Sequence, residues 1–351
     1  MSAPAQPFLT VDIELTNRCN AKCYFCPRDQ TPHQGLMSEA VFDQALARAI
    51  EFRDASAELQ GLRVRVSLCG LGEPLLNPIA AASVRKVKDA GFECVMSSNG
   101  SILDERKARA LLDAGLDAVN INVGDHDDEY EDIYKLPFGK TLDNVVRFNE
   151  MAGDDCEVNI VLVDYRRDRK HVNDMVHYWQ DRGLKHFTFY DIMNRGGALF
   201  VDDMQFEASP HVASAKTMMA AQGSHMLCAA PFVFIFIGYD GNYYLCCSDW
   251  KKEVPLGSVL DFPINAIVGE KLDRVATREP ICKSCNWDPL NLLADELRAV
   301  DDGESDEEKV AALVDDMVAT TKRIEAGVAT IQQVTPPSRP SRRISIPVTS
   351  A

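Results

Sequence analysis

Short apolar stretches alternate with longer amphipathic stretches between residues 8 and 190 of this 351-residue chain. The apolar stretches have the length of β-strands, and the amphipathic ones repeat with the period of an α-helix. Six strands are predicted in this way, at residues 8–15, 63–68, 92–97, 118–123, 157–163 and 185–190. Right-handed crossovers return each such strand beside its neighbour, so the strands run parallel. We therefore predict an α/β fold with helices outside the sheet, two units short of the eight that close a full barrel.

Polar or cysteine-bearing stretches follow directly after most of these strands. They occupy residues 19–26, 70–74, 97–100, 124–128 and 194–197. The carboxyl ends of parallel strands meet at one edge of the sheet, which is where barrel enzymes place their active sites. The sequence therefore predicts one functional site assembled from these loops.

The loop after the first strand carries three cysteines in the spacing C-x3-C-x2-C, at Cys19, Cys23 and Cys26. Three thiolates on one short loop can hold three irons of a [4Fe–4S] cluster, and the fourth iron is then open for chemistry. The alternative from the spacing alone is a structural zinc site with three cysteines and one histidine, for which His33 is the candidate.

Glycines, a glutamate and small polar residues follow the second and third strands. Gly70, Gly72 and Glu73 belong to the stretch Gly-Leu-Gly-Glu-Pro, and Ser97 and Asn99 belong to Ser-Ser-Asn-Gly. Either stretch is also an ordinary turn between a strand and a helix. Their place at the predicted active edge makes them candidates for binding a ligand.

Four further cysteines lie within residues 201–300, a region that begins with a predicted helix and continues with a β-hairpin. The hairpin strands are predicted at 232–237 and 243–247, around an Asp-Gly turn. The pattern is C-x12-G-x4-C followed by C-x2-C, and its cysteines are Cys228, Cys246, Cys282 and Cys285. Four cysteines also suit a structural zinc site. Cys247 points away from Cys246 in an extended strand, so it is a core residue or a free thiol near the cavity.

Together these motifs resemble the radical SAM superfamily, whose enzymes bind S-adenosylmethionine (SAM) at the open iron of such a cluster. The resemblance implies a partial (β/α)6 barrel over residues 1–200, in which one electron from the cluster cleaves SAM to methionine and a 5′-deoxyadenosyl radical. It also implies that the glycine-rich stretch and its glutamate, here Gly70, Gly72 and Glu73, receive the methionyl ammonium of SAM. The polar end of the third strand, here Ser97 and Asn99, would contact the ribose or carboxylate of SAM.

The C-terminal pattern resembles the SPASM/twitch module that follows the barrel in this superfamily. Full SPASM modules carry further cysteines and two auxiliary clusters, whereas no cysteine follows Cys285 here. The resemblance therefore implies a twitch, a β-hairpin plus helix over residues 201–300, with one auxiliary [4Fe–4S] cluster. Its implied ligands are Cys228, Cys246, Cys282 and Cys285. The implied cofactors are the two clusters and SAM, and the implied partner is an electron donor such as flavodoxin or ferredoxin.

The remaining cysteines and a run of acidic residues have simpler interpretations. Cys69, Cys94 and Cys156 lie in or beside strands, where a free cysteine usually behaves as a small buried hydrophobe. Residues 125–132 hold six carboxylates and one histidine. We expect a solvated loop and an acidic first helical turn there, although the same residue types can hold a metal.

Charge and composition narrow the setting. The formal charge of −16 disfavours a nucleic-acid partner, because its field repels phosphate. No run is long and apolar enough to cross a membrane, and residues 1–7 lack the basic and apolar parts of a signal peptide. We therefore expect a cytoplasmic protein in which the eleven cysteines do not form disulfides.

The composition changes near residue 301. Residues 301–308 are acidic, residues 310–326 have helical periodicity, and residues 335–351 are rich in proline, serine and arginine. The last stretch has too little apolar surface to order itself. We predict that residues 301–351 form an acidic helix followed by a disordered tail.

The function implied by the resemblance is hydrogen abstraction from a small molecule. The chain is most like dehydrogenases of the 2-deoxy-scyllo-inosamine type, oxidoreductases of aminoglycoside biosynthesis that oxidise an alcohol. Arg195, after the sixth strand, is the candidate to hold or deprotonate a hydroxyl, and Cys247 is the candidate hydrogen donor if the enzyme is an epimerase. Decarboxylation of a sugar, maturation of a peptide substrate and a non-enzymatic zinc scaffold are the other interpretations.

Overall fold

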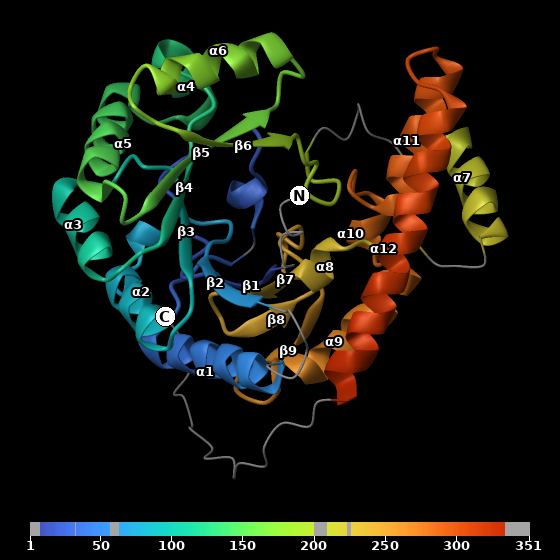
Figure 1. The fold of residues 1–351 in the computed structure, drawn as a ribbon, viewed down its shortest axis with the longest axis horizontal. Helices are drawn as coiled ribbons and strands as arrows, with labels where there is room; N and C mark the ends of the chain where they lie inside the picture. Colours follow the sequence, from blue (N-terminus) through green and yellow to red (C-terminus); the bar gives the residue numbers. More distant parts are fainter. Residues whose placement is uncertain (1–7, 32, 57–62, 200–208, 223–225, 334–351) are drawn as a thin grey trace, which may run out of the picture.

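The computed structural model describes residues 8–31, 33–56, 63–199, 209–222 and 226–333. These residues build a nine-stranded sheet in the order β6-β5-β4-β3-β2-β1-β7-β8-β9 (Figure 1). The strands are β1 (Phe8–Ile13), β2 (Arg63–Leu68), β3 (Cys94–Ser98), β4 (Ala118–Asn122), β5 (Glu157–Asp164), β6 (His186–Asp191), β7 (Phe234–Ile237), β8 (Asn242–Tyr244) and β9 (Pro255–Ser258). β1 to β6 pair in parallel with their neighbours in the sequence, which confirms the parallel sheet predicted from the strand–helix alternation.

The C-terminal hairpin joins this sheet and does not form a small sheet of its own. β7 pairs in parallel with β1, and β8 and β9 follow in antiparallel order. The hairpin turn lies at Asp240-Gly241 as predicted, and Gly241 has a φ of +80°, which a residue without a Cβ atom adopts at no steric cost. The second hairpin strand ends at Tyr244, earlier than the predicted residue 247. The domain limits at residues 200 and 300 stay predictions.

Helices cover the outer face of the parallel strands (Figure 1). They are α1 (Glu39–Ser56), α2 (Ala80–Asp89), α3 (Glu105–Asp113), α4 (Asp127–Tyr134), α5 (Phe138–Ala152) and α6 (Arg169–Gln180), with short 3₁₀ turns η1 (Pro27–Gln30) and η2 (Pro74–Leu76) in the loops. Local sequence sets the helix ends. Asp104 caps α3 by accepting a hydrogen bond from the Lys107 amide at 2.9 Å, and Gly115, with a φ of +87°, follows the other end.

Alternation along β1 separates the hydrophobic core from the interior of the barrel. Val11 is fully buried in the core beneath the helices. Asp12 and Glu14, on either side of Ile13 in the sequence, project from the opposite face of the strand into the barrel interior, and both are buried. The barrel interior therefore carries polar side chains. The sheet curls strongly, because Tyr190 of β6 lies close enough to Asp12 for the carboxylate to affect its pKa, although four strands separate β6 from β1.

Helices from the C-terminal part form a second apolar cluster beside the sheet (Figure 1). These are α7 (Pro210–Ala221), α11 (Pro289–Asp301) and α12 (Glu307–Gln333), while α9 (Ile264–Thr277) packs between α12 and α1 and the single turns α8 (Ala230–Val233) and α10 (Pro280–Lys283) flank the cysteines. α12 is the acidic helix predicted from the sequence. The predicted disordered tail at residues 335–351 lies outside the described residues.

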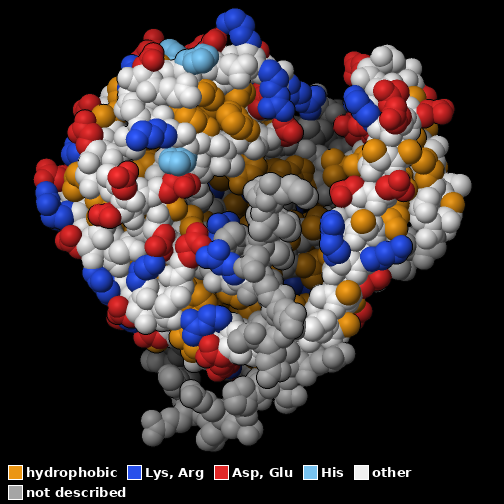
Figure 2. Space-filling view, in the orientation of Figure 1, with side chains coloured by type: hydrophobic (Ala, Val, Ile, Leu, Met, Phe, Trp, Pro, Cys, Tyr) orange, Lys and Arg blue, Asp and Glu red, His pale blue; other side chains and the backbone are white. Residues whose placement is uncertain are grey.

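The face shown in Figure 2 is hollowed between the barrel and the arm formed by α11 and α12. Hydrophobic side chains gather around this hollow, and acidic and basic side chains are mixed over the surrounding surface. In the described part of the chain, every helix is too short or too polar to cross a membrane.

Candidate cofactor and metal centre

The cysteine loop leaves the end of β1 and is fastened to α4. The Lys22 amide donates to the Tyr134 carbonyl, and the Tyr24 amide donates to the Ile133 carbonyl, each at 3.0 Å. Arg28 reaches back into the loop and donates to the Ala21 carbonyl at 2.8 Å. The ring of Phe25 packs edge-on against Tyr134 with centroids 5.5 Å apart. These contacts fix the backbone that carries the three thiols.

The three thiols of this loop lie close enough to affect one another. Burial raises the pKa of Cys19 to about 11, and the charges of Glu73 and Cys26 add to the shift. Burial also raises the pKa of Cys23, with Cys26 and Cys19 acting in the same direction. A thiol binds a metal as the thiolate, so occupation of this site releases protons.

The spacing of the cysteines distinguishes a cluster from a single ion. Thiolates around one tetrahedral zinc ion lie about 3.8 Å apart, because each Zn–S bond is about 2.3 Å long. Within the described ranges, three residues place their ligand atoms within 4.8 Å of one another: Asp125, Glu129 and His171. No three described cysteines come that close together. His33, the fourth ligand of the zinc alternative, is exposed. The cysteines are spread more widely than a single ion allows, and a four-iron cluster holds its thiolates on separate irons.

Gly70 and Gly72 are required by close packing after β2. A Cβ atom at Gly72 would overlap the backbone carbonyl of Thr16, and one at Gly70 would overlap the side chain of Glu14. The two glycines therefore let the Gly-Leu-Gly-Glu-Pro stretch lie directly against the end of β1. Their contact with SAM stays a prediction.

Glu73 is buried between the ends of β2 and β3. Its carboxylate accepts hydrogen bonds from the Asn99 amide at 2.8 Å, the Ser98 hydroxyl at 3.0 Å and the Leu75 amide at 3.1 Å. Burial raises the pKa of Glu73 to about 7, although these donors oppose the shift. The serine that meets Glu73 is Ser98, whereas Ser97 projects from the other face of β3. Ser97 lies in register with Asn120 of β4, and its contact with SAM stays a prediction.

Asn99 lies between Glu73 and the cysteine loop. Its Nδ2 donates to Asn20 Oδ1 at 3.0 Å and lies 3.7 Å from Cys19 Sγ, while its Oδ1 accepts from the Ser101 hydroxyl at 2.6 Å. Hydrogen bonds to a ligand sulfur orient it and adjust the properties of the metal. Asn99 is therefore placed to act on Cys19 as well as on a ligand beside it.

The C-terminal cysteines gather in one region beside the barrel interior. Cys228 precedes β7, which runs parallel to β1, and Cys246 follows β8, which runs back. Burial raises the pKa of Cys246 far above its usual value, and Cys247, Cys285 and Cys228 add to the shift. Burial likewise raises the pKa of Cys282 to about 12, with Cys228 and Cys285 among the contributing charges. The four predicted ligands and Cys247 thus share one region.

A pair of asparagines fastens the loop after β6 to this cysteine region. The backbone amides of Asn194 and Asn286 donate to each other's side-chain oxygens at 3.0 and 3.2 Å. Asn194 Nδ2 also donates to the Ser284 carbonyl at 2.6 Å, and Asn286 Nδ2 donates to the Ile192 carbonyl at 2.8 Å. We call these two residues the asparagine clasp. The clasp brings the residue after Asn194 to the auxiliary cysteines.

Arg195, the residue after Asn194, lies near Cys247. Burial raises the pKa of Cys247, the Arg195 guanidinium opposes the shift, and the Asp12 carboxylate adds to it. Arg195 has a φ of 51°, and its Nε is buried without a hydrogen-bond partner among the described residues. The structure thus brings together the two residues that the sequence singled out for catalysis, and their roles stay predictions.

The sequence analysis missed an ion pair between Glu14, which follows β1, and Lys252, which lies between β8 and β9. Glu14 is fully buried, accepts a hydrogen bond from the Leu71 amide at 3.0 Å and lies 2.9 Å from Lys252 Nζ. Lys252 Nζ also lies 4.4 Å from the centroid of the Phe236 ring. The ammonium is not angled for a directed hydrogen bond, so the contact with Glu14 is an ion pair. The alternating polar positions of the first strand, Thr10, Asp12 and Glu14, were the signal available in the sequence.

The three cysteines assigned to the core behave differently from one another. Cys94 and Cys156 are buried in the core as predicted. The prediction for Cys69 is wrong, because its thiol lies inside the barrel and donates to Asp12 Oδ1 at 3.2 Å. Cys69 directly follows the last residue of β2, and its side chain points into the barrel interior toward Asp12.

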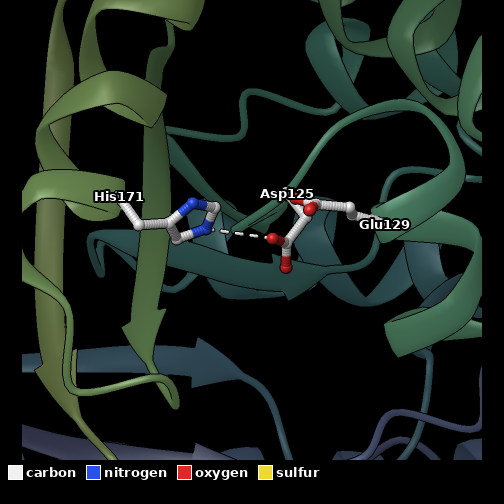
Figure 3. A group of neighbouring side chains, drawn as sticks. All are labelled: Asp125, Glu129 and His171. Carbon is white, nitrogen blue, oxygen red and sulfur yellow. Dashed lines mark ion pairs between the residues drawn. The ribbon is translucent and has the colours of Figure 1, made fainter.

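A buried carboxylate group lies at the ends of β4 and β5 (Figure 3). Asp125 is fully buried, which contradicts the solvated loop predicted there, and its Oδ1 lies 2.9 Å from His171 Nε2 and 2.8 Å from Arg166 Nη2. Arg166 also pairs with Glu129 at 3.1 Å. The ligand atoms of Asp125, Glu129 and His171 are close enough for one ion, but the guanidinium already neutralises both carboxylates. The acidic first turn of α4, from residue 127, is confirmed.

Comparison with known families agrees with this arrangement. A model of the radical SAM superfamily matches residues 13–177, and a model of the SPASM iron–sulfur cluster-binding domain matches residues 228–286. The chain belongs to the radical SAM superfamily and carries a SPASM domain behind its barrel. Its cofactors are accordingly a SAM-binding [4Fe–4S] cluster, an auxiliary cluster and SAM.

Individual relatives are distant. A GTP 3′,8-cyclase of Limosilactobacillus fermentum is 28% identical over 193 residues, which cover 54% of this chain and 55% of that protein. The chain thus spans about half the length of the curated relatives it matches. The solved structure of anSMEcpe with bound AdoMet has a TM-score of 0.55 at 15% identity, covering 92% of this chain and 100% of that one, a likeness that shows the fold alone. BtrN in complex with AdoMet and 2-DOIA has a TM-score of 0.48 at 16% identity, covering 81% and 94%.

Proposed function

We propose that this protein is a radical SAM oxidoreductase that oxidises an alcohol of a small sugar-type or cyclitol-type metabolite in natural-product biosynthesis. The observation that carries the proposal is the presence of two separate thiol sets beside a barrel with a polar interior. Asn159 Nδ2 donates there to Asn120 Oδ1 and to the Thr188 hydroxyl, each at 2.8 Å. A row of amide and hydroxyl groups suits a polyhydroxylated substrate, because each can exchange its present partner for a substrate hydroxyl.

The residues of the chain divide into three roles in this proposal. Cys19, Cys23 and Cys26 would hold the first cluster, and the surroundings of SAM would be Gly70, Gly72, Glu73, Ser97 and Asn99. The auxiliary cluster would be held by Cys228, Cys246, Cys282 and Cys285. When bound, these groups would supply a hydrogen-abstracting 5′-deoxyadenosyl radical and a fully ligated electron acceptor. Arg195 would hold the substrate hydroxyl beside Cys247, and a flavodoxin or ferredoxin would supply the first electron.

Epimerisation of a sugar is the second candidate, and the position of Cys247 favours it. An epimerase must return a hydrogen atom to the substrate radical, and a thiol is a good donor because its S–H bond is weak. Cys247 is near Arg195 and Asp12, on the side of the auxiliary cysteines that meets the barrel interior. A peptide substrate is a third candidate, since anSMEcpe was also solved with AdoMet and the Cp18Cys peptide.

Metal analysis tests the assignment of the cysteines. Anaerobic reconstitution should give about eight irons per chain, four for each cluster. Replacing Cys19, Cys23 and Cys26 together by Ala should leave about four irons and abolish SAM cleavage. Cys156→Ala, which removes a thiol in the core, is the matched control and should leave the iron content unchanged. SAM cleavage by the triple variant, or zinc in place of iron, would contradict the assignment.

Isotope transfer tests the reaction. The reconstituted enzyme, SAM and a one-electron reductant are incubated with a panel of C-deuterated cyclitols, aminocyclitols and sugars. Oxidation should place deuterium in 5′-deoxyadenosine and produce a ketone. Inversion of the carbon with solvent deuterium incorporated, together with its loss in Cys247→Ala, would identify an epimerase instead.

A further inference from the structure

Oxidation of an alcohol requires a group that accepts the hydroxyl proton, and the predicted candidate is poorly suited to that task. The guanidinium of Arg195 is a strong donor and holds its protons at any ordinary pH. The barrel interior contains a carboxylate that no motif had singled out. We propose that Asp12 on β1 accepts the hydroxyl proton of the substrate alcohol. The proposal rests on the proposed alcohol oxidation and adds its missing proton acceptor.

The place of Asp12 in the sheet puts it between the two thiol sets. Asp12 lies one residue before the last residue of β1, the strand that leads into the cysteine loop, and it is close enough to Cys247 for its carboxylate to affect the pKa of that thiol. In register, Asp12 lies opposite Ser67 of β2 and Phe236 of β7, so its side chain shares the interior face with theirs. A substrate bound in the barrel interior between the two thiol sets would lie beside this position.

One of the two hydrogen-bond donors to Asp12 is a thiol, which is a weak donor. The Cys69 thiol donates to Oδ1 at 3.2 Å, and the Ser67 hydroxyl also donates to the carboxylate. A thiol donor is easily exchanged for a substrate hydroxyl, which forms the stronger bond. The two other buried carboxylates of the interior are committed, since Glu14 is paired with Lys252 and Glu73 accepts three hydrogen bonds.

The charge surroundings of Asp12 suit a proton acceptor near neutral pH. The side chain is 4% exposed, and burial raises the pKa of Asp12 to about 7, opposed by Cys69, Ser67, Arg65 and Lys271. The other titratable groups that face it are Cys247 after β8 and Tyr190 on β6. A base whose pKa lies near the working pH is both largely available and strong enough to take a proton in the transition state.

The step balances with the groups already assigned. The carbinol carbon of the substrate loses its hydrogen atom to the SAM-derived 5′-deoxyadenosyl group, and its oxygen loses a proton to the Asp12 carboxylate. The auxiliary iron–sulfur cluster, when bound, would accept the remaining electron as the C=O bond forms. Asp12 then returns its proton to solvent after the ketone leaves.

The first measurement needs no substrate. Infrared difference spectra of reconstituted wild type against Asp12→Asn isolate the carbonyl stretch of a protonated carboxyl at position 12. The band should be present at pH 6, lost at pH 8 and have its midpoint near pH 7. A midpoint near the usual value of 3.8 would overturn the proposal.

The second measurement separates hydrogen abstraction from proton removal. With a C-deuterated cyclitol or aminocyclitol that wild type oxidises, Asp12→Asn should still transfer deuterium into 5′-deoxyadenosine, while ketone formation falls by about 100-fold or more. Asp12→Glu should restore part of the ketone yield, and the acidic limb of the wild-type pH profile should disappear in Asp12→Asn. Thr10→Val, which changes the preceding inward residue of β1 and removes the acceptor of a 3.0 Å hydrogen bond from Arg65, is the control and should keep the wild-type ratio of ketone to 5′-deoxyadenosine.

The outcomes distinguish this proposal from the proposed function. A wild-type enzyme that oxidises no probe of the panel contradicts alcohol oxidation, and the infrared midpoint then still decides whether position 12 holds a proton acceptor for neutral pH. A wild-type enzyme that oxidises a probe, with Asp12→Asn producing ketone at the same rate, supports the proposed function and overturns the role of Asp12. Equal loss of deuterium transfer and ketone in Asp12→Asn, with no recovery in Asp12→Glu, would make Asp12 structural and also overturn it.

Discussion

Asp12, Glu14 and Glu73 are buried carboxylates of one barrel, and their partners separate their roles. Glu14 forms an ion pair with the buried ammonium of Lys252 at 2.9 Å. Glu73 accepts three hydrogen bonds but is buried deeply enough that its pKa still rises to about 7. The pKa of Asp12 also rises to about 7, and its hydrogen-bond partners are Cys69 and Ser67. Near neutral pH, therefore, Asp12 and Glu73 change their protonation in response to what binds beside them.

At this scale, binding of SAM should depend on the charge of Glu73. The Glu73 pKa of about 7 means that lowering the pH from 8 to 6 protonates the carboxyl of the unbound protein and removes the acceptor for the SAM ammonium, so SAM should bind more weakly at the lower pH. Glu73→Gln should weaken SAM by about 1.5 to 3 kcal/mol, roughly 10- to 150-fold, and should flatten the pH dependence. Titration calorimetry on the anaerobic reconstituted protein measures both.

Ser98→Ala is the control for this prediction. It removes one hydrogen bond to Glu73 and keeps the carboxylate, so SAM affinity should change much less than in Glu73→Gln. An unchanged dissociation constant in Glu73→Gln would eliminate the ammonium contact, whereas equal losses in both variants would mean that the shape of the β3 end matters and the charge does not.

Among the helices and strands, local pattern predicted which elements form but not which of them become neighbours. Strand β4 lies within two residues of its predicted limits, because alternation acts within a few residues. The partner of β7 could not be predicted, since pairing with β1 depends on which sheet edge is free after the whole barrel has formed. β3 begins at Cys94 and not at residue 92, because Phe92 packs in the core before the strand starts.

The same limit applies to the candidate site. Cysteine spacing and the glycine-rich stretch identified both thiol sets, since these motifs are local. Asp12 and Glu14 were missed, because polar residues at every second position of a strand look like an ordinary solvated face. Only the curled sheet turns that face into an enclosed interior. Asn194 was placed correctly in a loop, but its partner Asn286 is 92 residues away in sequence.

The asparagine clasp yields a prediction for these two elements. Asn194→Ala removes the two side-chain hydrogen bonds to Ser284 and Asn286 and leaves buried polar groups without partners. The free energy of unfolding should fall by about 1 to 3 kcal/mol, and the auxiliary cluster should lose iron faster to a chelator, because the C-x2-C segment is held less firmly. Asn149→Ala, which removes an exposed 3.2 Å hydrogen bond to the Gly183 carbonyl, is the matched control and should change stability by less than about 0.5 kcal/mol. Identical iron loss in the two variants would contradict a role for the clasp.

The whole molecule places both thiol sets on one continuous sheet. Because β7 pairs with β1, the cysteine loop after β1 and Cys228 before α8 and β7 are connected through paired backbone and not through a flexible linker. The C-terminal helices extend this connection. Thr321 of α12 is buried and accepts a hydrogen bond from the amide of Leu227, the residue before Cys228, at 2.9 Å. A helix far along the chain thus holds the backbone of a predicted cluster ligand.

This long-range contact gives the prediction that belongs to the whole molecule. Thr321→Val keeps the branched shape of the side chain but leaves the Leu227 amide buried without a partner, at a cost of about 1 to 3 kcal/mol. The strain falls beside Cys228, so iron release to a chelator should become biphasic, with about four of eight irons leaving faster than in wild type. Thr330→Val makes the same substitution at an exposed position of α12 and should release iron as wild type does. Uniform acceleration of all irons, or equal release in the two variants, would show that α12 supports the fold as a whole and does not hold the auxiliary site.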